Sequence, residues 1–99
     1  MNIQSEMSGN TLTVKPEGRL DTLQSPQLEK YLKEHAEQAH DVVMDLEKVD
    51  YISSAGLRVL IQEQKRLREK KGGMVVRNVC ESVMNVLELT GFVHVLTIE

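Results

Sequence analysis

The 99-residue chain is long enough for one domain and too short for two, and its 40% of hydrophobic residues suffices for a core. The net charge of −3 argues against nucleic acid as the main partner, because phosphate backbones are bound by basic surfaces. The lone Cys80 excludes an internal disulfide, and no apolar run approaches the roughly 20 residues of a membrane helix, so we expect a cytoplasmic protein that binds no membrane.

The N-terminal segment predicts an antiparallel hairpin. Residues 2–7 and 10–16 alternate loosely between apolar and polar side chains, and the short stretch between them has the composition of a turn. We expect Pro16 and Gly18 to end the second strand.

A helix and a buried strand are predicted next. Ser25-Pro26 is typical of a helix start, with the serine as a side-chain cap and the proline at the first helical position. Apolar residues then recur at helical spacing, and we expect this helix to end near His40. Residues 42–46 form a nearly continuous apolar run, which predicts a central strand covered on both faces.

The clearest helix is predicted over residues 54–71, with Gly72-Gly73 closing it. Charged side chains such as Glu63 and Arg66 are expected to face water. Its inner stripe is expected to be Leu57, Leu60, Ile61, Gln64 and Leu67.

The C-terminal third predicts three further elements: a buried strand at 74–79, a short helix at 81–89 and a final strand over 93–97. Strands that alternate with helices after an initial hairpin indicate an α/β fold. We expect a mixed β-sheet, antiparallel in the N-terminal hairpin and parallel afterwards, with helices packed against it.

The segment from Asp45 to Arg58 carries the strongest functional signal. A buried strand leaves the sheet, passes a loop and enters a helix through Ser53 and Ser54. Backbone N–H groups are free at a helix N-terminus and the helix dipole is positive there, so a phosphate on either serine would be stabilised. Gly56, which has no Cβ, would let the backbone approach a partner or a neighbouring loop. The spacing alone also fits an ordinary helix cap, which contributes ~1 kcal/mol.

Four motifs resemble those of one known family. In chain order they are Gly18-Arg19-Leu20-Asp21, then Asp45-Leu46 followed by Tyr51-Ile52-Ser53-Ser54-Ala55-Gly56-Leu57, then Gly72-Gly73-Met74-Val75-Val76 and Leu89-Thr90-Gly91-Phe92. Together they resemble the signature of STAS-domain anti-sigma factor antagonists, the anti-anti-sigma factors. Because the matches span most of the chain, we expect residues 1–99 to form a single STAS domain.

The resemblance implies a partner switch. Proteins of this family bind an anti-sigma factor that is also an ATP-dependent serine kinase of the GHKL type, and the unphosphorylated form captures this kinase and frees a sigma factor. The kinase phosphorylates the antagonist and releases it, and a PP2C-type phosphatase restores it. Related stand-alone domains feed secretion, motility or biofilm control through a similar switch, and the sequence does not separate these outputs.

The family's acceptor is the serine that directly follows an aspartate. Alignment on Gly56 places this acceptor at Ser54, with Ser53 in the aspartate position and as the rival acceptor. Asp21 matches a loop aspartate near the acceptor, a place that a turn or capping residue would also fill. Arg58 lies one turn after the acceptor, where it would pair with a phosphate or an acidic partner residue. The predicted partner-binding residues are Asp21, Ser53, Ala55, Gly56 and Arg58.

A serine-dependent enzyme is the alternative from another class. The sequence around Ser54 is not a Gly-x-Ser-x-Gly elbow, and no motif places His35, His40 or His94 as a base. No pair of potential ligands has metal-site spacing, and a Gly-rich phosphate loop is missing. The sequence therefore favours a binding module without cofactor or metal over an enzyme.

Overall fold

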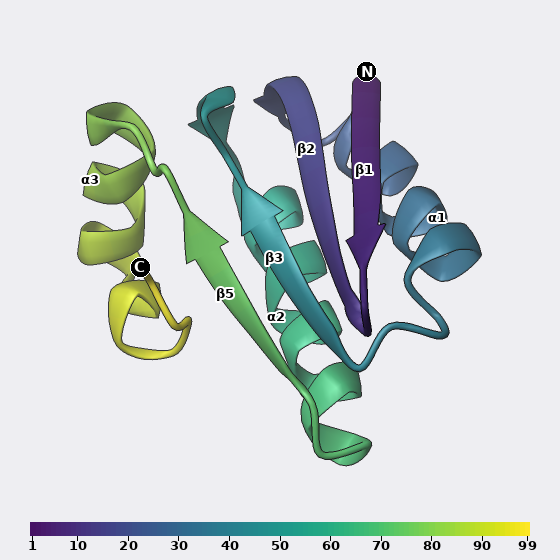
Figure 1. Cartoon of the computed structure of the whole chain (residues 1–99). Helices are drawn as coiled ribbons and strands as arrows, with labels where there is room; N and C mark the ends of the chain where they lie inside the picture. Colours follow the sequence, from purple (N-terminus) through teal and green to yellow (C-terminus); the bar gives the residue numbers. More distant parts are fainter.

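A computed structural model describes all residues from Met1 to Glu99 as a mixed sheet with helices packed against it (Figure 1). The elements in chain order are β1 (Asn2–Ser8), β2 (Thr11–Leu20), α1 (Ser25–His35), β3 (Asp41–Asp45), β4 (Lys48–Ile52), α2 (Ser54–Glu69), β5 (Gly73–Arg77), α3 (Glu81–Thr90) and the 3-10 helix η1 (Phe92–His94). In Figure 1, α1 and α2 lie behind the sheet, and α3 lies at its side next to β5. No helix combines the length and the apolar character needed to cross a bilayer.

The predicted mixed sheet is confirmed. β1 and β2 form the antiparallel hairpin, and β2, β3 and β5 then follow side by side as parallel neighbours. β4 is also parallel to β2 but pairs with its second half, beyond the end of β3. The single long strand β2 therefore connects two parallel ladders.

β2 is longer than predicted, because Pro16 and Gly18 do not end it. Its pairing with β3 stops at Val14, and its pairing with β4 starts at Glu17. Pro16, which has no N–H group, falls between these two ladders and so removes a hydrogen bond from neither. Gly18 has a φ of 109° and lies at the bulge where the register with β4 shifts.

β4 lies where the sequence analysis predicts a loop. The two buried residues of this strand, Val49 and Ile52, are three positions apart rather than two. The bulge opposite them causes this spacing, since Gly18 pairs with Val49 and Arg19 pairs with Tyr51. The alternation that normally identifies a strand is therefore absent from the sequence.

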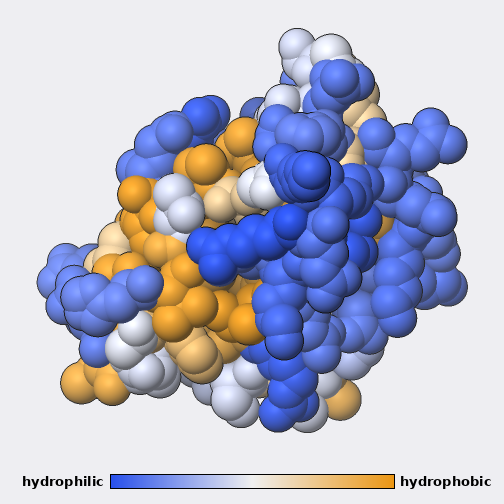
Figure 2. All heavy atoms as spheres, turned by 90° about the horizontal axis from the view of Figure 1, so that it is seen from below, coloured by the Kyte–Doolittle hydropathy of each residue, from blue (hydrophilic) through white to orange (hydrophobic).

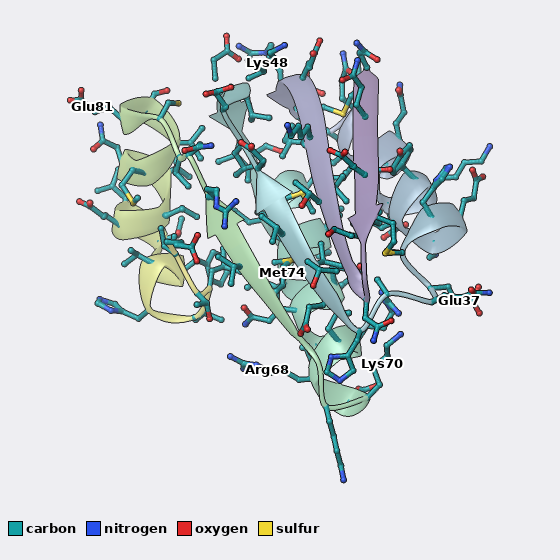
Figure 3. All side chains as sticks on the ribbon, in the orientation of Figure 1. Glu37, Lys48, Arg68, Lys70, Met74 and Glu81 are labelled. Atoms are coloured by element: carbon teal, nitrogen blue, oxygen red, sulfur yellow. The ribbon has the colours of Figure 1, made fainter.

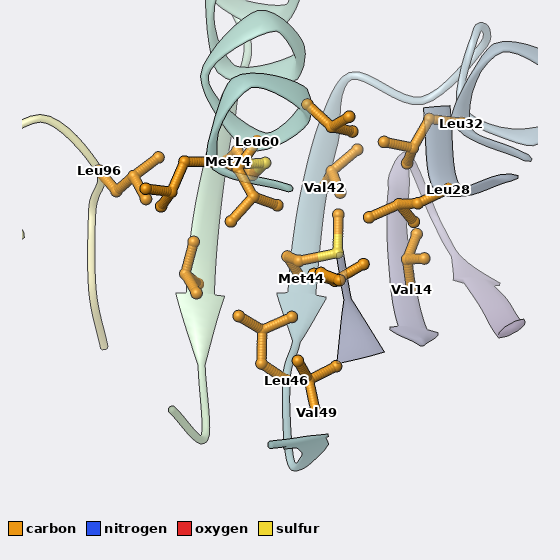
Figure 4. Close-up of a cluster of buried hydrophobic side chains, with 14 of the residues drawn as sticks. Val14, Leu28, Leu32, Val42, Met44, Leu46, Val49, Leu60, Met74 and Leu96 are labelled. Atoms are coloured by element: carbon orange, nitrogen blue, oxygen red, sulfur yellow. The ribbon is translucent and has the colours of Figure 1, made fainter. Parts of the chain in front are cut away.

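The core lies on one face of the sheet only, so the prediction that residues 42–46 are covered on both faces is wrong. Val42 and Met44 are buried, whereas Val43 between them is partly exposed. Figure 4 shows side chains from α1, such as Leu28, and from α2, such as Leu60, directed toward the buried side chains of the strands. Apolar atoms also reach the surface at the end of the molecule seen from below in Figure 2.

α1 begins and ends differently from the prediction. Ser25 is not a cap: it is buried in the first turn, and Gln24 takes the N-cap position without a side-chain hydrogen bond. The helix ends at His35 rather than near His40. The amides of His40 and Asp41 bond to the main-chain oxygen of Asn10, which commits this stretch to the start of β3.

Glu63 on α2 is buried, with 6% of its surface exposed, so the prediction that it faces water is wrong. α1 packs against this side of α2. Arg66 donates to both carboxylate oxygens of Glu63, at 2.8 and 2.9 Å, and to the main-chain oxygen of Ala36 at 3.1 Å. The carboxylate raises the pKa of Arg66, and the ion pair gives the buried charge a partner.

The predicted final strand over 93–97 is wrong. Gly91, with a φ of 81°, ends α3 in the left-handed conformation, and η1 follows directly. Gln64 of α2 donates to the main-chain oxygen of Val95 at 2.9 Å, which fixes the chain after η1. A single bridge between Ile98 and Val76 is the strand pairing that remains.

Replacement of Gly72 tests the junction between α2 and β5. A Cβ at Gly72 would lie 1.7 Å from the main-chain oxygen of His40, so one of the two backbones must move. We expect Gly72→Ala to lower the free energy of unfolding by about 2–3 kcal/mol, measured by urea denaturation. Gly73→Ala is the matched control, because its Cβ would approach nothing closer than 3.9 Å. Equal denaturation midpoints for the two variants would contradict the predicted close approach.

Candidate functional site

Two neighbouring strands end side by side at one edge of the sheet, and each leads into a helix. Leu20 at the end of β2 pairs with Ile52 at the end of β4. Because the strands are parallel, the turn that precedes α1 and the first turn of α2 lie at the same edge. The Ser53 amide donates to the main-chain oxygen of Leu20 at 2.9 Å, which joins the two connections directly.

Ser53 is the N-cap of α2 and is only partly exposed. Its hydroxyl donates to the main-chain oxygen of Leu20 at 3.0 Å and accepts the Gly56 amide at 3.4 Å. Donor and acceptor are therefore both used within the fold, as expected of a structural cap.

Ser54 is the first residue of α2 and is exposed. Its hydroxyl takes no part in the hydrogen bonds of the folded chain. The first amide with an acceptor inside the helix is that of Leu57, which donates to the main-chain oxygen of Ser53 at 2.9 Å. Of the amides before it, that of Gly56 is bonded to the Ser53 hydroxyl and those of Ser54 and Ala55 have no acceptor, so an anion carried by Ser54 would meet the positive end of the helix.

Gly56 is buried beneath this surface rather than part of it. A Cβ at this position would lie 2.8 Å from Cγ1 of Ile52 and 2.8 Å from the main-chain oxygen of Leu20. The missing side chain allows α2 to begin directly against the ends of β2 and β4. Gly56 therefore sets the position of Ser54 and is not itself available for contact with another protein.

Asp21 caps the turn between β2 and α1. Its Oδ1 accepts the Gln24 amide at 2.8 Å, and its main-chain oxygen accepts the Ser25 amide at 2.9 Å. Its Oδ2 lies 3.9 Å from Nε of Arg19. The capping role that the sequence left open is present, and the carboxylate also remains partly exposed beside an arginine.

Three further exposed residues lie on the strand ends and the turn that meet here, although the sequence alone gives them no role. The Arg19 guanidinium lies 4.1 Å from the centre of the Tyr51 ring, and both follow from the register of β2 with β4. Leu23, at the turn before α1, is 83% exposed. The sequence held one signal for the exposure of Leu23: it is a single leucine within a polar stretch and does not continue the apolar spacing of the following helix.

We call this region the Ser54 surface. Arg58 completes it, because residues i and i+4 share a helix face and Arg58 is exposed without an ion-pair partner. No group of three potential metal ligands gathers here or elsewhere in the chain. The Ser54 surface comprises Arg19, Asp21, Leu23, Tyr51, Ser54, Ala55 and Arg58.

Comparison with known proteins identifies relatives of the whole chain. The family model of the STAS domain matches residues 2–99. BtrV of Bordetella bronchiseptica, provisionally named an anti-sigma factor antagonist, is 35% identical over 83 residues, which cover 83% of this chain and 72% of BtrV. The anti-sigma-B factor antagonist of Bacillus subtilis is 26% identical over 98 residues, which cover 99% of this chain and 90% of that protein.

Solved structures share the fold. The anti-sigma factor antagonist SpoIIAA in its unphosphorylated form has a TM-score of 0.82 at 17% identity, over 99% of this chain and 88% of that one. The Bacillus cell fate determinant SpoIIAA in the phosphorylated form has a TM-score of 0.74 at 16% identity, over 99% of this chain and 91% of that one. The arrangement of sheet and helices is therefore common to these proteins.

Substitution by alanine separates the roles of the two serines. We expect Ser53→Ala to lower the free energy of unfolding by about 1–2 kcal/mol, because it removes the cap and the bond to Leu20. Ser54→Ala serves as the control and should stay within about 0.5 kcal/mol of the wild type, since its hydroxyl makes no contact. Urea denaturation measures both, and a larger loss for Ser54→Ala would contradict the assignment.

Proposed function

The chain belongs to the STAS-domain family, and from that premise we propose that it is an anti-sigma factor antagonist whose partner binding is switched by phosphorylation of Ser54. The proposed partner is an anti-sigma factor that is also a GHKL-type serine kinase, and a PP2C-type phosphatase reverses the modification in the cytoplasm. The observation that carries this proposal is the exposed, unbonded Ser54 hydroxyl at the start of a long helix.

The contacts of the two serines favour Ser54 as the acceptor. A phosphate on Ser53 would replace a hydroxyl that holds α2 to Leu20, and so would disturb the fold. A phosphate on Ser54 would lie at the positive helix end, one turn from the guanidinium of Arg58. SpoIIAA, which shares the fold, is named in phosphorylated and unphosphorylated forms, and this supports a fold that tolerates both states.

The modification would act on the surface rather than on the fold. The hydrogen bonds that position the start of α2 join Ser53 to Leu20 and to Gly56, and none of them involves the Ser54 side chain. A phosphate adds about −1.5 to −2 charges, and a partner that covers Ser54 would have to strip water from this dianion. Every ~1.4 kcal/mol of this cost weakens binding about tenfold, so phosphorylation would favour release of the partner.

Phosphate transfer tests the proposal. The purified chain is incubated with ATP and, in turn, with each GHKL-type serine kinase of its source organism. We expect one kinase to add one phosphate, located on Ser54 by peptide mass spectrometry. Ser54→Ala should stay unmodified and remain bound to that kinase, whereas Ser54→Asp should bind at least about tenfold more weakly, because it places a permanent charge in the contact.

Ser53→Ala is the matched control for the acceptor, because it removes the neighbouring hydroxyl and leaves Ser54 in place. It should still accept one phosphate from the same kinase. Full labelling of Ser54→Ala, a phosphate on Ser53, or a set of kinases none of which modifies the chain would each refute the proposal. Equal affinity of Ser54→Ala and Ser54→Asp would remove the electrostatic basis of the switch.

A further inference from the structure

The turn between β2 and α1 presents one leucine to solvent on a fixed backbone. The Leu23 side chain is 83% exposed. The backbone around it is nevertheless held, because Asp21 before it accepts the amides of Gln24 and Ser25 after it. Pro26 in the first turn of α1 restricts the backbone further. Because the backbone is already ordered, burial of Leu23 in a partner would cost little conformational entropy.

This turn continues into the first turn of α2. Leu20 is the last residue of β2, and its main-chain oxygen accepts both the amide and the hydroxyl of Ser53. Leu23 follows Leu20 by three residues, and Ser54 directly follows Ser53. The two segments that carry the exposed leucine and the proposed acceptor are therefore bonded to each other shortly before each of these residues.

We propose that Leu23 is the apolar anchor of the Ser54 surface: it enters an apolar pocket of the kinase, and an acidic side chain of the kinase pairs with Arg58. The inference rests on the function proposed above and specifies the chemistry of the partner. Arg19 already has Asp21 and the Tyr51 ring as neighbours, whereas Arg58 has no ion-pair partner. The complementary surface is thus an apolar pocket beside a carboxylate.

The anchor connects phosphorylation to release. Burial of Leu23 in a pocket requires that water leaves the surrounding surface, including that over Ser54. A phosphate there holds its hydration shell, and it repels the carboxylate that faces Arg58. Modification of one residue therefore opposes both the apolar and the ionic part of the contact.

Exposure alone does not distinguish an anchor, because single exposed apolar side chains are common on protein surfaces. The chain contains a second leucine of this kind, since Leu89 is 87% exposed. α3 begins at Glu81, at the same end of the molecule as Lys48, the first residue of β4 (Figures 1 and 3). The helix runs away from that end, so Leu89 lies near the opposite end of α3. The two leucines match in side chain and exposure and differ in location.

The experiment compares Leu23→Ala with Leu89→Ala in the full chain. The probe is the purified kinase that modifies Ser54 in the assay above, and its dissociation constant for each unphosphorylated variant is measured by calorimetry. We expect Leu23→Ala to bind about ten- to a hundredfold more weakly, the value of one buried leucine side chain. Leu89→Ala should stay within about twofold of the wild type, and Leu23→Met should restore most of the affinity because it keeps an apolar side chain of similar volume.

Melting temperatures of the variants show that they remain folded, because both leucines lie outside the core. Unchanged binding by Leu23→Ala, equal weakening by the two alanine variants, or no recovery in Leu23→Met would overturn the anchor while leaving Ser54 as the acceptor. Failure of every kinase to modify Ser54 would instead overturn the proposed function, and the anchor with it.

Discussion

The close approach of α2 to the end of β2 is the constraint on which the Ser54 surface depends. Gly56 lies where any side chain would overlap Leu20 and Ile52, and Ser53 bonds to the same Leu20 through its amide and its hydroxyl. These contacts determine where α2 begins, and so which serine is held within the fold and which faces solvent. The turn capped by Asp21 follows the same leucine. Leu20 therefore positions both the turn before α1 and the first turn of α2.

Two adjacent serines have separate physical roles as a result. The Ser53 hydroxyl is bonded within the fold, and a change there weakens the attachment of α2 to Leu20. The Ser54 hydroxyl makes no hydrogen bond within the fold, so the proposed phosphate would break none of these bonds and would lie at the positive end of the helix. A switch of the proposed kind changes affinity only through the difference in how a partner contacts the two forms, which is the thermodynamic requirement for any such switch.

Periodicity in the sequence was sufficient for the hairpin, for α2 and for the mixed sheet, because these depend on local patterns and short connections. It failed where a distant segment decides the local structure. The bulge at Gly18 disrupts the alternation of buried and exposed residues in β4. α1 covers Glu63, although the sequence around it is typical of an exposed helix face. Gln64 of α2 holds the chain after η1 by a hydrogen bond to Val95, where a strand was predicted. The serine pair at a helix start was predictable, but the partner of the Ser53 hydroxyl was not, since Leu20 lies 33 residues away.

The same reasoning explains why Arg19 and Tyr51 were missed. Arg19 and Tyr51 face each other only because the bulge moves the register by one residue, so neither position stands out in the sequence. A register shift at a strand end re-aims side chains without changing the sheet behind them. The sheet and its single buried face supply stability, whereas the irregular ends of β2 and β4 determine which side chains are exposed there. Leu20 and Ile52 at these ends belong to the core, whereas their neighbours Arg19 and Tyr51 are exposed, so variation at the exposed positions would leave the core packing in place.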